Sequence, residues 1–408
     1  MFPENTQPDE NKDRTTVFLS TRIYPGDGAP FSGHVKVSGT KIVDAGPGRP
    51  KEVTDSPGQD EAGNIVDLGD NIVIPGLIDL HIHGSYGFDV ASQDPEAISA
   101  MARYLAGTGT TAFLPTLGAM PVDLTCEIVE RVSRLVGKNR HTGAEILGLH
   151  LEGPFLNPLK KGAMREEYLL EPSVGLMSRW FELSKGSLNH VAIAPELPGA
   201  QEVISFLAGR KVAVAAGHTM ATYEQALDSI SWGVTVANHT YNAMREFRHR
   251  DPGILGAVFT DNRIWAELLC DGIHVHPAAV LTVLAAKGLD KAYLVSDALT
   301  PAGLPPGQYS SLGHGIMVDE DGKAYLDNGT LAGSTATLLD CLKNVVCWTQ
   351  RPLEDVLPLA ALNPAKVAGV ANRKGSLASG KDADFVVLDS EYNVILTVVN
   401  GECREPNT

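Results

Sequence analysis

Residues that commonly bind divalent metal ions stand at the ends of several apolar segments of this chain. His81 and His83 follow the apolar run 71–80. Because alternate side chains of a β-strand point the same way, two histidines one residue apart at a strand end can direct both imidazoles at one point. The sequence therefore predicts a metal site at a place where several strands end. Four more residues of ligand type end apolar segments of strand length: Glu152, His218, His239 and Asp297.

The donor set indicates which ion and which reaction to expect. Four imidazoles and a carboxylate suit Zn²⁺ or Fe²⁺, with Mn²⁺ or Co²⁺ as substitutes, and one or two ions per chain. Two ions about 3.5–4 Å apart would lower the pKa of a water and polarise a carbonyl. Asp297 could then take a proton from the attacking water and give one to a leaving amine, as in amide hydrolysis.

Each of these residues also has a structural interpretation. Glu152 could be the partner of a salt bridge, and Asp297 could cap a helix that begins at Ala298. His150, on the same strand face as Glu152, could support a ligand or be an ordinary core histidine.

The elements that must position these residues alternate between strand-like and helix-like segments. Such alternation predicts an α/β fold, and eight strand–helix units predict a (β/α)₈ barrel of the TIM type. Catalytic groups of such barrels lie at the carboxyl ends of the strands. We expect strands at 72–81, 111–117, 146–152, 191–197, 212–218, 234–239, 266–270 and 292–297, and helices at 95–107, 222–232 and 277–288.

Short strand-like segments and turns occupy both ends of the chain. Neither end is large enough to bury a core alone, so we expect one small β-sandwich built from residues 15–73 and 366–408. The barrel would then span 74–365, and the polar segment 1–14 would be a flexible tail.

Composition excludes several classes of partner. The net charge is −16 over 408 residues, which argues against binding to nucleic acid or to an anionic membrane. The chain lacks an apolar run of about 18 residues and an apolar core for a signal peptide. Five cysteines without a C-x-x-C motif favour reduced thiols and a cytoplasmic location.

Several local motifs make the chain resemble the amidohydrolase superfamily and, within it, the N-acetylglucosamine-6-phosphate deacetylases. The resemblance implies a metal-dependent hydrolase that converts N-acetylglucosamine 6-phosphate to glucosamine 6-phosphate and acetate. It covers nearly the whole chain. The motifs are 149–155 (LHLEGPF), 216–219 (AGHT), 239–244 (HTYNAM), 250–253 (RDPG), 271–274 (DGIH) and 296–298 (SDA).

The resemblance also implies the residues that bind the substrate. The basic segment 245–250 could be an anion site or a solvated loop, and in the family the matching region holds the sugar phosphate. A homodimer would share that site, with Arg250 and His274 reaching into the neighbouring subunit. The implied phosphate and sugar contacts are Asn242, Ala243, Arg250, His274, Ala332 and Gly333.

Two departures from the family pattern leave alternatives open. Met164 stands where many relatives carry a histidine that helps to hold the substrate carbonyl, and many of those relatives lack His81 and His83. We therefore hypothesise that a second ion replaces part of that histidine's role. The remaining alternatives are an epimeric substrate such as N-acetylgalactosamine 6-phosphate, a deaminase or cyclic amidase, and a catalytically inactive scaffold. The fourth strand ends without a lysine at 194–197, which disfavours the dihydroorotase and hydantoinase patterns.

Overall fold

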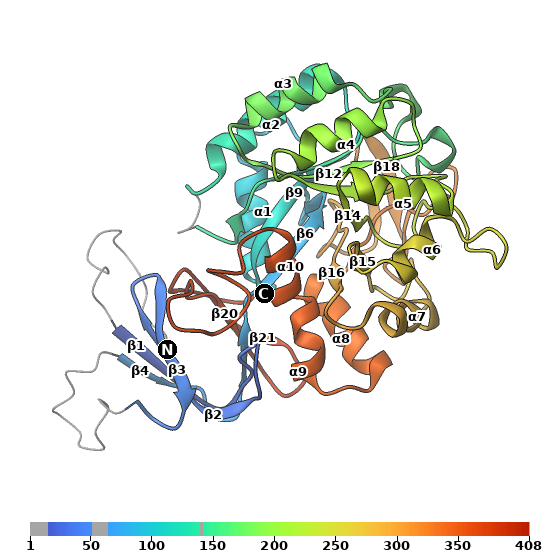
Figure 1. The fold of residues 1–408 in the computed structure, drawn as a ribbon. Helices are drawn as coiled ribbons and strands as arrows, with labels where there is room; N and C mark the ends of the chain where they lie inside the picture. Colours follow the sequence, from blue (N-terminus) through green and yellow to red (C-terminus); the bar gives the residue numbers. More distant parts are fainter. Residues whose placement is uncertain (1–14, 51–63, 139–141, 408) are drawn as a thin grey trace.

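A computed structural model describes residues 15–50, 64–138 and 142–407. In this part of the chain, parallel strands form a nearly closed barrel, and helices surround them (Figure 1). The expected tail 1–14 lies outside the described residues. The barrel strands are β6 (Leu77–Ile82), β9 (Thr110–Leu117), β10 (Glu145–Ile146) with β11 (Leu149–Glu152), β12 (Leu188–Ile193), β13 (Ala213–Ala216), β14 (Val234–Ala237), β15 (Trp265–Leu269) and β16 (Ala292–Val295).

The barrel strands pair in chain order from β9 to β16, and β6 pairs with β9. A parallel bridge between Ile82 and Ala298 brings the ends of the first and last barrel strands, β6 and β16, together. Helices surround the strands (Figure 1), as expected for a parallel sheet that is buried on both faces. They are α1 (Ala97–Ala106), α2 (Val122–Leu135), α3 (Val174–Ser184), α4 (Ala200–Ala208), α5 (Tyr223–Trp232), α6 (Gly253–Thr260), α7 (Pro277–Lys287), α8 (Leu338–Thr349), α9 (Leu353–Val356) and α10 (Leu362–Val367).

The helix boundaries follow from local capping chemistry. Helix α5 begins with a capping box, in which Thr222 and Gln225 each bond the other's backbone N–H. Helix α7 begins with Pro277 at its first position, and the His276 side chain caps it by accepting the Ala278 N–H. No helix of the described residues is both long and apolar enough to span a bilayer.

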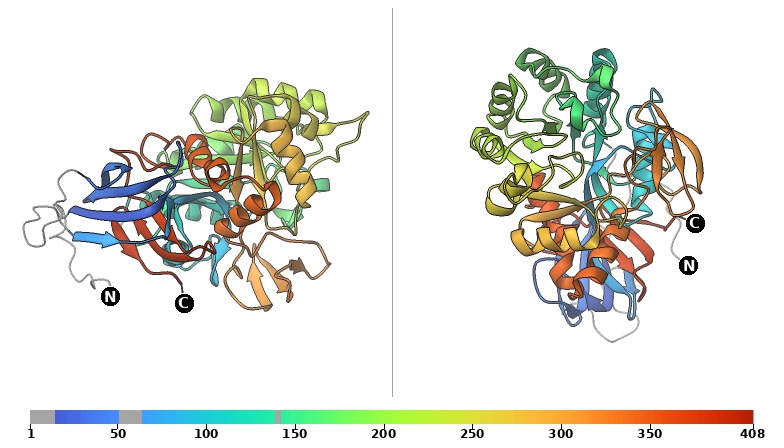
Figure 2. Two further views of the ribbon diagram at one scale, coloured as in Figure 1. Left: turned by 90° about the horizontal axis from the view of Figure 1, so that it is seen from below. Right: turned by 90° about the vertical axis from the view of Figure 1, so that its right-hand side faces the viewer.

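Strands from both chain ends form a second sheet that folds around its own apolar core. The order is β22-β21-β20-β5-β1-β2-β3, with β4 paired to β1, so the first and last parts of the chain lie side by side (Figure 2). Phe18 and Phe385 meet in this core with ring centroids 4.9 Å apart. The strands are β1 (Thr15–Ile23), β2 (Phe31–Ser38), β3 (Lys41–Pro47), β4 (Asn64–Asp67), β5 (Ile72–Pro75), β20 (Phe385–Leu388), β21 (Val394–Val399) and β22 (Glu402–Arg404).

The strand expected at 72–81 is two strands in two sheets. β5 belongs to the terminal sheet and β6 to the barrel, with Gly76 between them. The Gly76 N–H donates to Asp384 O, and a Cβ at Gly76 would lie 2.1 Å from Thr111 Oγ1. Only glycine allows this close passage from one sheet to the other.

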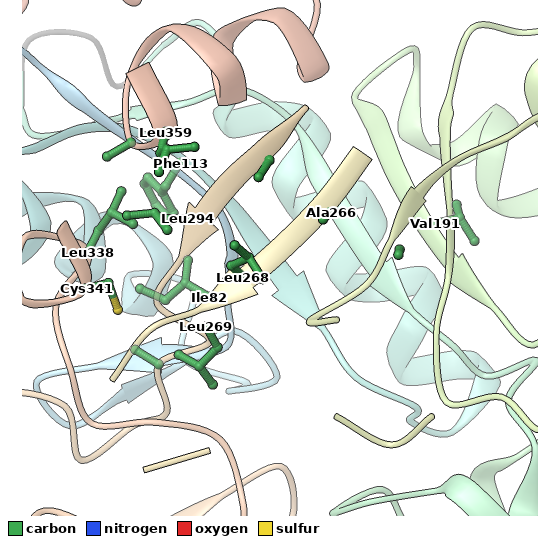
Figure 3. Close-up of a cluster of buried hydrophobic side chains, with 14 of the residues drawn as sticks. Ile82, Phe113, Val191, Ala266, Leu268, Leu269, Leu294, Leu338, Cys341 and Leu359 are labelled. Atoms are coloured by element: carbon green, nitrogen blue, oxygen red, sulfur yellow. The ribbon is translucent and has the colours of Figure 1, made fainter. Parts of the chain in front are cut away.

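The apolar core of the barrel lies mainly between the strands and the helices. Leu294 on β16, Leu338 and Cys341 on α8, and Phe113 on β9 belong to one buried cluster, seen in Figure 3. All five cysteines are free thiols, and Cys126, Cys270 and Cys341 are buried.

A small sheet follows the last barrel strand, β16, and was not expected from the sequence. Strands β17 (Gly307–Ser311), β18 (His314–Val318) and β19 (Ala324–Leu326) form it. Figure 2 shows this sheet standing off from the barrel strands. Leu312, in the turn between β17 and β18, reaches the functional pocket described next.

Candidate metal centre and active site

The six residues expected to bind metal converge at the carboxyl ends of the barrel strands. They form two buried groups that share a centre: His81, His83 and Asp297 in one, and Glu152, His218 and His239 in the other. Glu152 lies between them, since its Oε1 is 2.9 Å from His239 Nε2 and its Oε2 is 3.1 Å from His83 Nε2.

The backbone at three of these strand ends turns sharply. His218, His239 and Asp297 have φ values of 48°, 25° and 48°, in the left-handed region that non-glycine residues rarely adopt. Such a conformation costs roughly 1–3 kcal/mol per residue and is concentrated at functional sites. Here it turns each side chain from the end of its strand toward the centre of the barrel mouth.

Hydrogen bonds to the far side of three imidazoles fix their orientation. Nδ1 of His81 donates to Glu267 Oε1 at 2.9 Å, that of His83 to Thr116 O at 3.1 Å, and that of His218 to Lys160 O at 2.8 Å. Each Nε2 is thereby left to face the shared centre. A donor set of this kind, with its outer nitrogens held by carboxylate and carbonyl groups, is what metal-binding histidines use.

The crowding of nitrogen atoms also fits bound cations. The Nε2 atoms of His81 and His83 are 3.2 Å apart, and those of His218 and His239 are 3.1 Å apart. Two imidazole nitrogens at such a distance are readily explained when both donate lone pairs to one ion.

The charges of the centre reinforce one another. Burial would raise the pKa of Glu152, but His81 and His218 lower it well below its usual value. Burial lowers the pKa of His83, whereas hydrogen bonds to Asp297 and Glu152 raise it to about 9. Glu152 is therefore anionic at neutral pH, and His83 carries a proton that a metal ion would displace.

A cavity of about 160 Å³ opens onto the two groups. Its wall includes every substrate residue expected from the sequence except Arg250, which is exposed and outside the cavity. His274 lies in the wall of the cavity of its own chain. Its Nδ1 is 2.6 Å from Asp271 Oδ2, and its Nε2 is bonded to Ala332 O. The other expected residues in the wall are Asn242, Ala243, Ala332 and Gly333.

Several residues that shape the site were not singled out from the sequence. Glu267 is fully buried in β15 and accepts bonds from His81, the Tyr293 hydroxyl and the His239 N–H. Asn238 donates to Glu152 Oε1 at 2.8 Å. A carboxylate inside the apolar run 265–269 was a readable signal, because a buried charge needs a partner.

Three residues with open interpretations now have defined surroundings. His150 is buried beneath the centre, with its ring centroid 4.7 Å from that of His81 and 5.6 Å from that of His190. No helix of the described chain begins at Ala298, so Asp297 does not cap one. Met164 lines the cavity.

The barrel, the two metal-type groups and the cavity define a class of hydrolase, and residues 72–404 match the amidohydrolase family model. The chain belongs to the amidohydrolase family. It is 37% identical to the N-acetylglucosamine-6-phosphate deacetylase of Vibrio furnissii, over 82% of this chain and 84% of that protein. It is 35% identical to the N-acetylgalactosamine-6-phosphate deacetylase of Escherichia coli O157:H7, over 81% and 87% of the two chains.

Solved structures agree with this assignment. A mutant N-acetyl-D-glucosamine-6-phosphate deacetylase from Mycobacterium smegmatis, in complex with N-acetyl-D-glucosamine-6-phosphate, matches with a TM-score of 0.88 and 29% identity. The match covers 96% of this chain and all of the other. The resemblance inferred from the local motifs and the barrel with a composite terminal sheet are both confirmed.

Proposed function

We propose that this chain hydrolyses N-acetylglucosamine 6-phosphate to glucosamine 6-phosphate and acetate. The observation that carries the proposal is the meeting of six metal-type residues beside one cavity, whose wall also holds Asn242, Ala243 and His274. The reaction adds the oxygen of water to the acetyl carbonyl carbon, breaks the C–N bond and leaves a proton on the amine. Relatives named for this activity match over most of the chain.

The two groups would hold two divalent ions. His81, His83 and Asp297 would bind one and His218 and His239 the other, with Glu152 between them. When bound, the ions would polarise the acetyl carbonyl and lower the pKa of water. The nitrogen and carboxylate donors favour Zn²⁺ or Fe²⁺. Metal analysis that finds two ions per fully active chain would support this assignment, and full activity with one ion would contradict it.

Asp297 is the proposed general base and acid. Its Oδ1 lies 3.4 Å from the Nε2 atoms of both His81 and His83, so it stands beside the place where water would attack. Burial would raise its pKa, but His81 and His83 lower it. The carboxylate is therefore ready to accept the proton from water and to deliver it to the departing amine.

The phosphate is expected on the wall formed after β14 and β15. The pKa of His274 is raised overall, because its hydrogen bond to Asp271 outweighs the lowering by burial. Asn242 is anchored there, since its N–H donates to His239 O at 2.9 Å. Arg250 is exposed on the same segment, and we propose that it completes the phosphate site of a second subunit in a homodimer.

One experiment tests the substrate assignment. Acetate release should be measured with metal-loaded protein on N-acetylglucosamine 6-phosphate, on its galacto epimer and on unphosphorylated N-acetylglucosamine. Fast release from the gluco phosphate alone supports the proposal. Release from the epimer alone would move the assignment to N-acetylgalactosamine 6-phosphate, which the relative from Escherichia coli makes the second candidate. No release from any of the three would refute both.

A further inference from the structure

The cavity has a polar wall and an apolar wall on opposite sides of the barrel mouth. Asn242 and His274 follow β14 and β15. Met164 packs on Gly118 and Ala119, which follow β9. In the closed order of barrel strands, β9 and β14 are four places apart, so Met164 and Asn242 lie on opposite sides of the barrel mouth. A substrate with its phosphate beside Asn242 and its amide at the centre would have its acyl chain on the side of Met164.

Met164 and Leu312 form the apolar wall, and both are buried. Met164 Sδ accepts the Ala119 N–H at 3.3 Å, which anchors the side chain. Gly118 leaves the space that both residues fill, because a Cβ there would lie 2.9 Å from Met164 Sδ and 3.3 Å from Leu312 Cδ2.

The two segments that carry this wall are tied in place. The Leu312 N–H donates to Asp89 Oδ2 at 3.1 Å, and the hydroxyls of Thr300 and Ser311 donate to the same oxygen at 3.0 Å. Arg165, next to Met164, donates from Nε to Gly313 O at 3.1 Å. Met164 and Leu312 are thus fixed relative to each other.

A second cavity of about 290 Å³ lies behind Met164. Gly162 and Met164 line both cavities, so the Met164 side chain lies at the boundary between them. The second cavity offers volume for added methylene groups, and its polar rim includes Lys161, Arg165 and His314.

We propose that Met164 limits the length of the acyl group that this enzyme removes. The acetyl methyl packs against Met164 and Leu312, and any longer acyl chain must displace Met164 toward the second cavity. The inference rests on the proposed deacetylase function and adds the selection of the acyl group to it. One methylene in an apolar pocket changes the specificity ratio by about 10–200-fold, which sets the scale of the effect.

The test compares kcat/KM for the N-acetyl, N-propionyl and N-butyryl forms of glucosamine 6-phosphate. In the wild-type protein, kcat/KM should fall at least about tenfold with each added methylene. In Met164→Ala the butyryl-to-acetyl ratio should rise at least about tenfold, because the boundary between the cavities is opened. Leu331→Ala is the matched control, since Leu331 lines the first cavity but not the second and should lower all three values by a similar factor.

A second variant guards against misfolding of the first. Gly118→Ala should push Met164 into the acyl space and lower the butyryl-to-acetyl ratio further, and adding Met164→Ala should reverse that loss. Calorimetric binding of the three compounds to the Asp297→Asn protein, with and without Met164→Ala, should follow the same order. Wild-type acetate release with unchanged acyl ratios in the Met164 and Gly118 variants would overturn this inference alone. No release from any N-acyl substrate would overturn the proposed function instead.

Discussion

Nδ1 of His81 donates to Glu267 Oε1 at 2.9 Å, and both side chains are fully buried. The same carboxylate accepts the Tyr293 hydroxyl at 2.6 Å and the His239 N–H at 2.8 Å. Glu267 therefore links the His81 imidazole, in the first metal-type group, to the backbone of His239, in the second. Burial would raise its pKa, but His81 lowers it, so the group is anionic.

Glu267→Gln should weaken metal binding. The amide keeps the shape but loses the charge that holds His81, and loss of such a partner typically costs 10–100-fold in metal affinity. Titration of the apo protein with Zn²⁺ measures the effect. Tyr293→Phe, which removes only one hydrogen bond to Glu267, is the control and should change affinity less. Equal affinities for wild type and Glu267→Gln would show that the ion does not depend on this contact.

Asp297→Asn should retain the fold and most of the bound metal, yet lower kcat by about 10²–10⁴-fold, because the amide cannot accept the proton from water. The substitution also suits the backbone, since asparagine tolerates the left-handed conformation of this residue. Metal content and kcat should be measured on the same preparation. Near-normal turnover would remove Asp297 from its proposed role.

Arg250 should act across a subunit boundary. Arg250→Ala should raise KM for the phosphorylated substrate, because a guanidinium that pairs with phosphate is lost. This variant can be refolded with an equal amount of Asp297→Asn, so that about half of the dimers contain one subunit of each kind. Each mixed dimer has one complete site out of two, so about a quarter of wild-type activity should return. If Arg250 served its own chain, the mixture would show only the average of the two parents.

Lys374 should be a strong contributor to stability. It is buried among Glu145, Asp382 and Asp384, with Nζ 2.7 Å from Glu145 Oε2 and 3.2 Å from Asp382 Oδ2. Removing one partner from such a cluster costs roughly 3–5 kcal/mol, so Lys374→Met should lower the free energy of unfolding by that amount in denaturant titrations. Lys41→Met is the control: Lys41 pairs with Asp382 at 2.7 Å but is 47% exposed, and its loss should cost less than about 1 kcal/mol.

The same cluster predicts loss of stability in acid. Burial would raise the pKa of Asp382, but Lys374 and its basic neighbours lower it to about 2. Since the unfolded value is about 3.9, this stabilisation is complete above that pH and is lost as pH falls toward 2. Asp384 acts in the opposite direction, because burial raises its pKa. Denaturant midpoints of chelator-treated protein between pH 6 and pH 3 should therefore fall more steeply for wild type than for Lys374→Met.

Much of the site could be predicted because strand ends are readable in the sequence. His81, Glu152 and Asp297 each end an apolar run, and the parallel barrel brings such ends together. Glu267 lies within its strand, so the sequence indicates a buried charge there but not that its partners are His81, His239 and Tyr293. The passage of the chain at Gly76 between two sheets was also hidden, since one apolar run serves both.

The position of β5 in the terminal sheet has a consequence for synthesis on the ribosome. β5 lies between β1 and β20, but β20 begins only at Phe385. While the barrel is being synthesised, one edge of β5 therefore has no strand to pair with. The first barrel strand, β6, follows directly after β5 in the chain. An open edge of this kind can recruit other chains. The terminal sheet can be completed only after residues 385–388 have been synthesised, so the nascent chain carries this open strand edge until then.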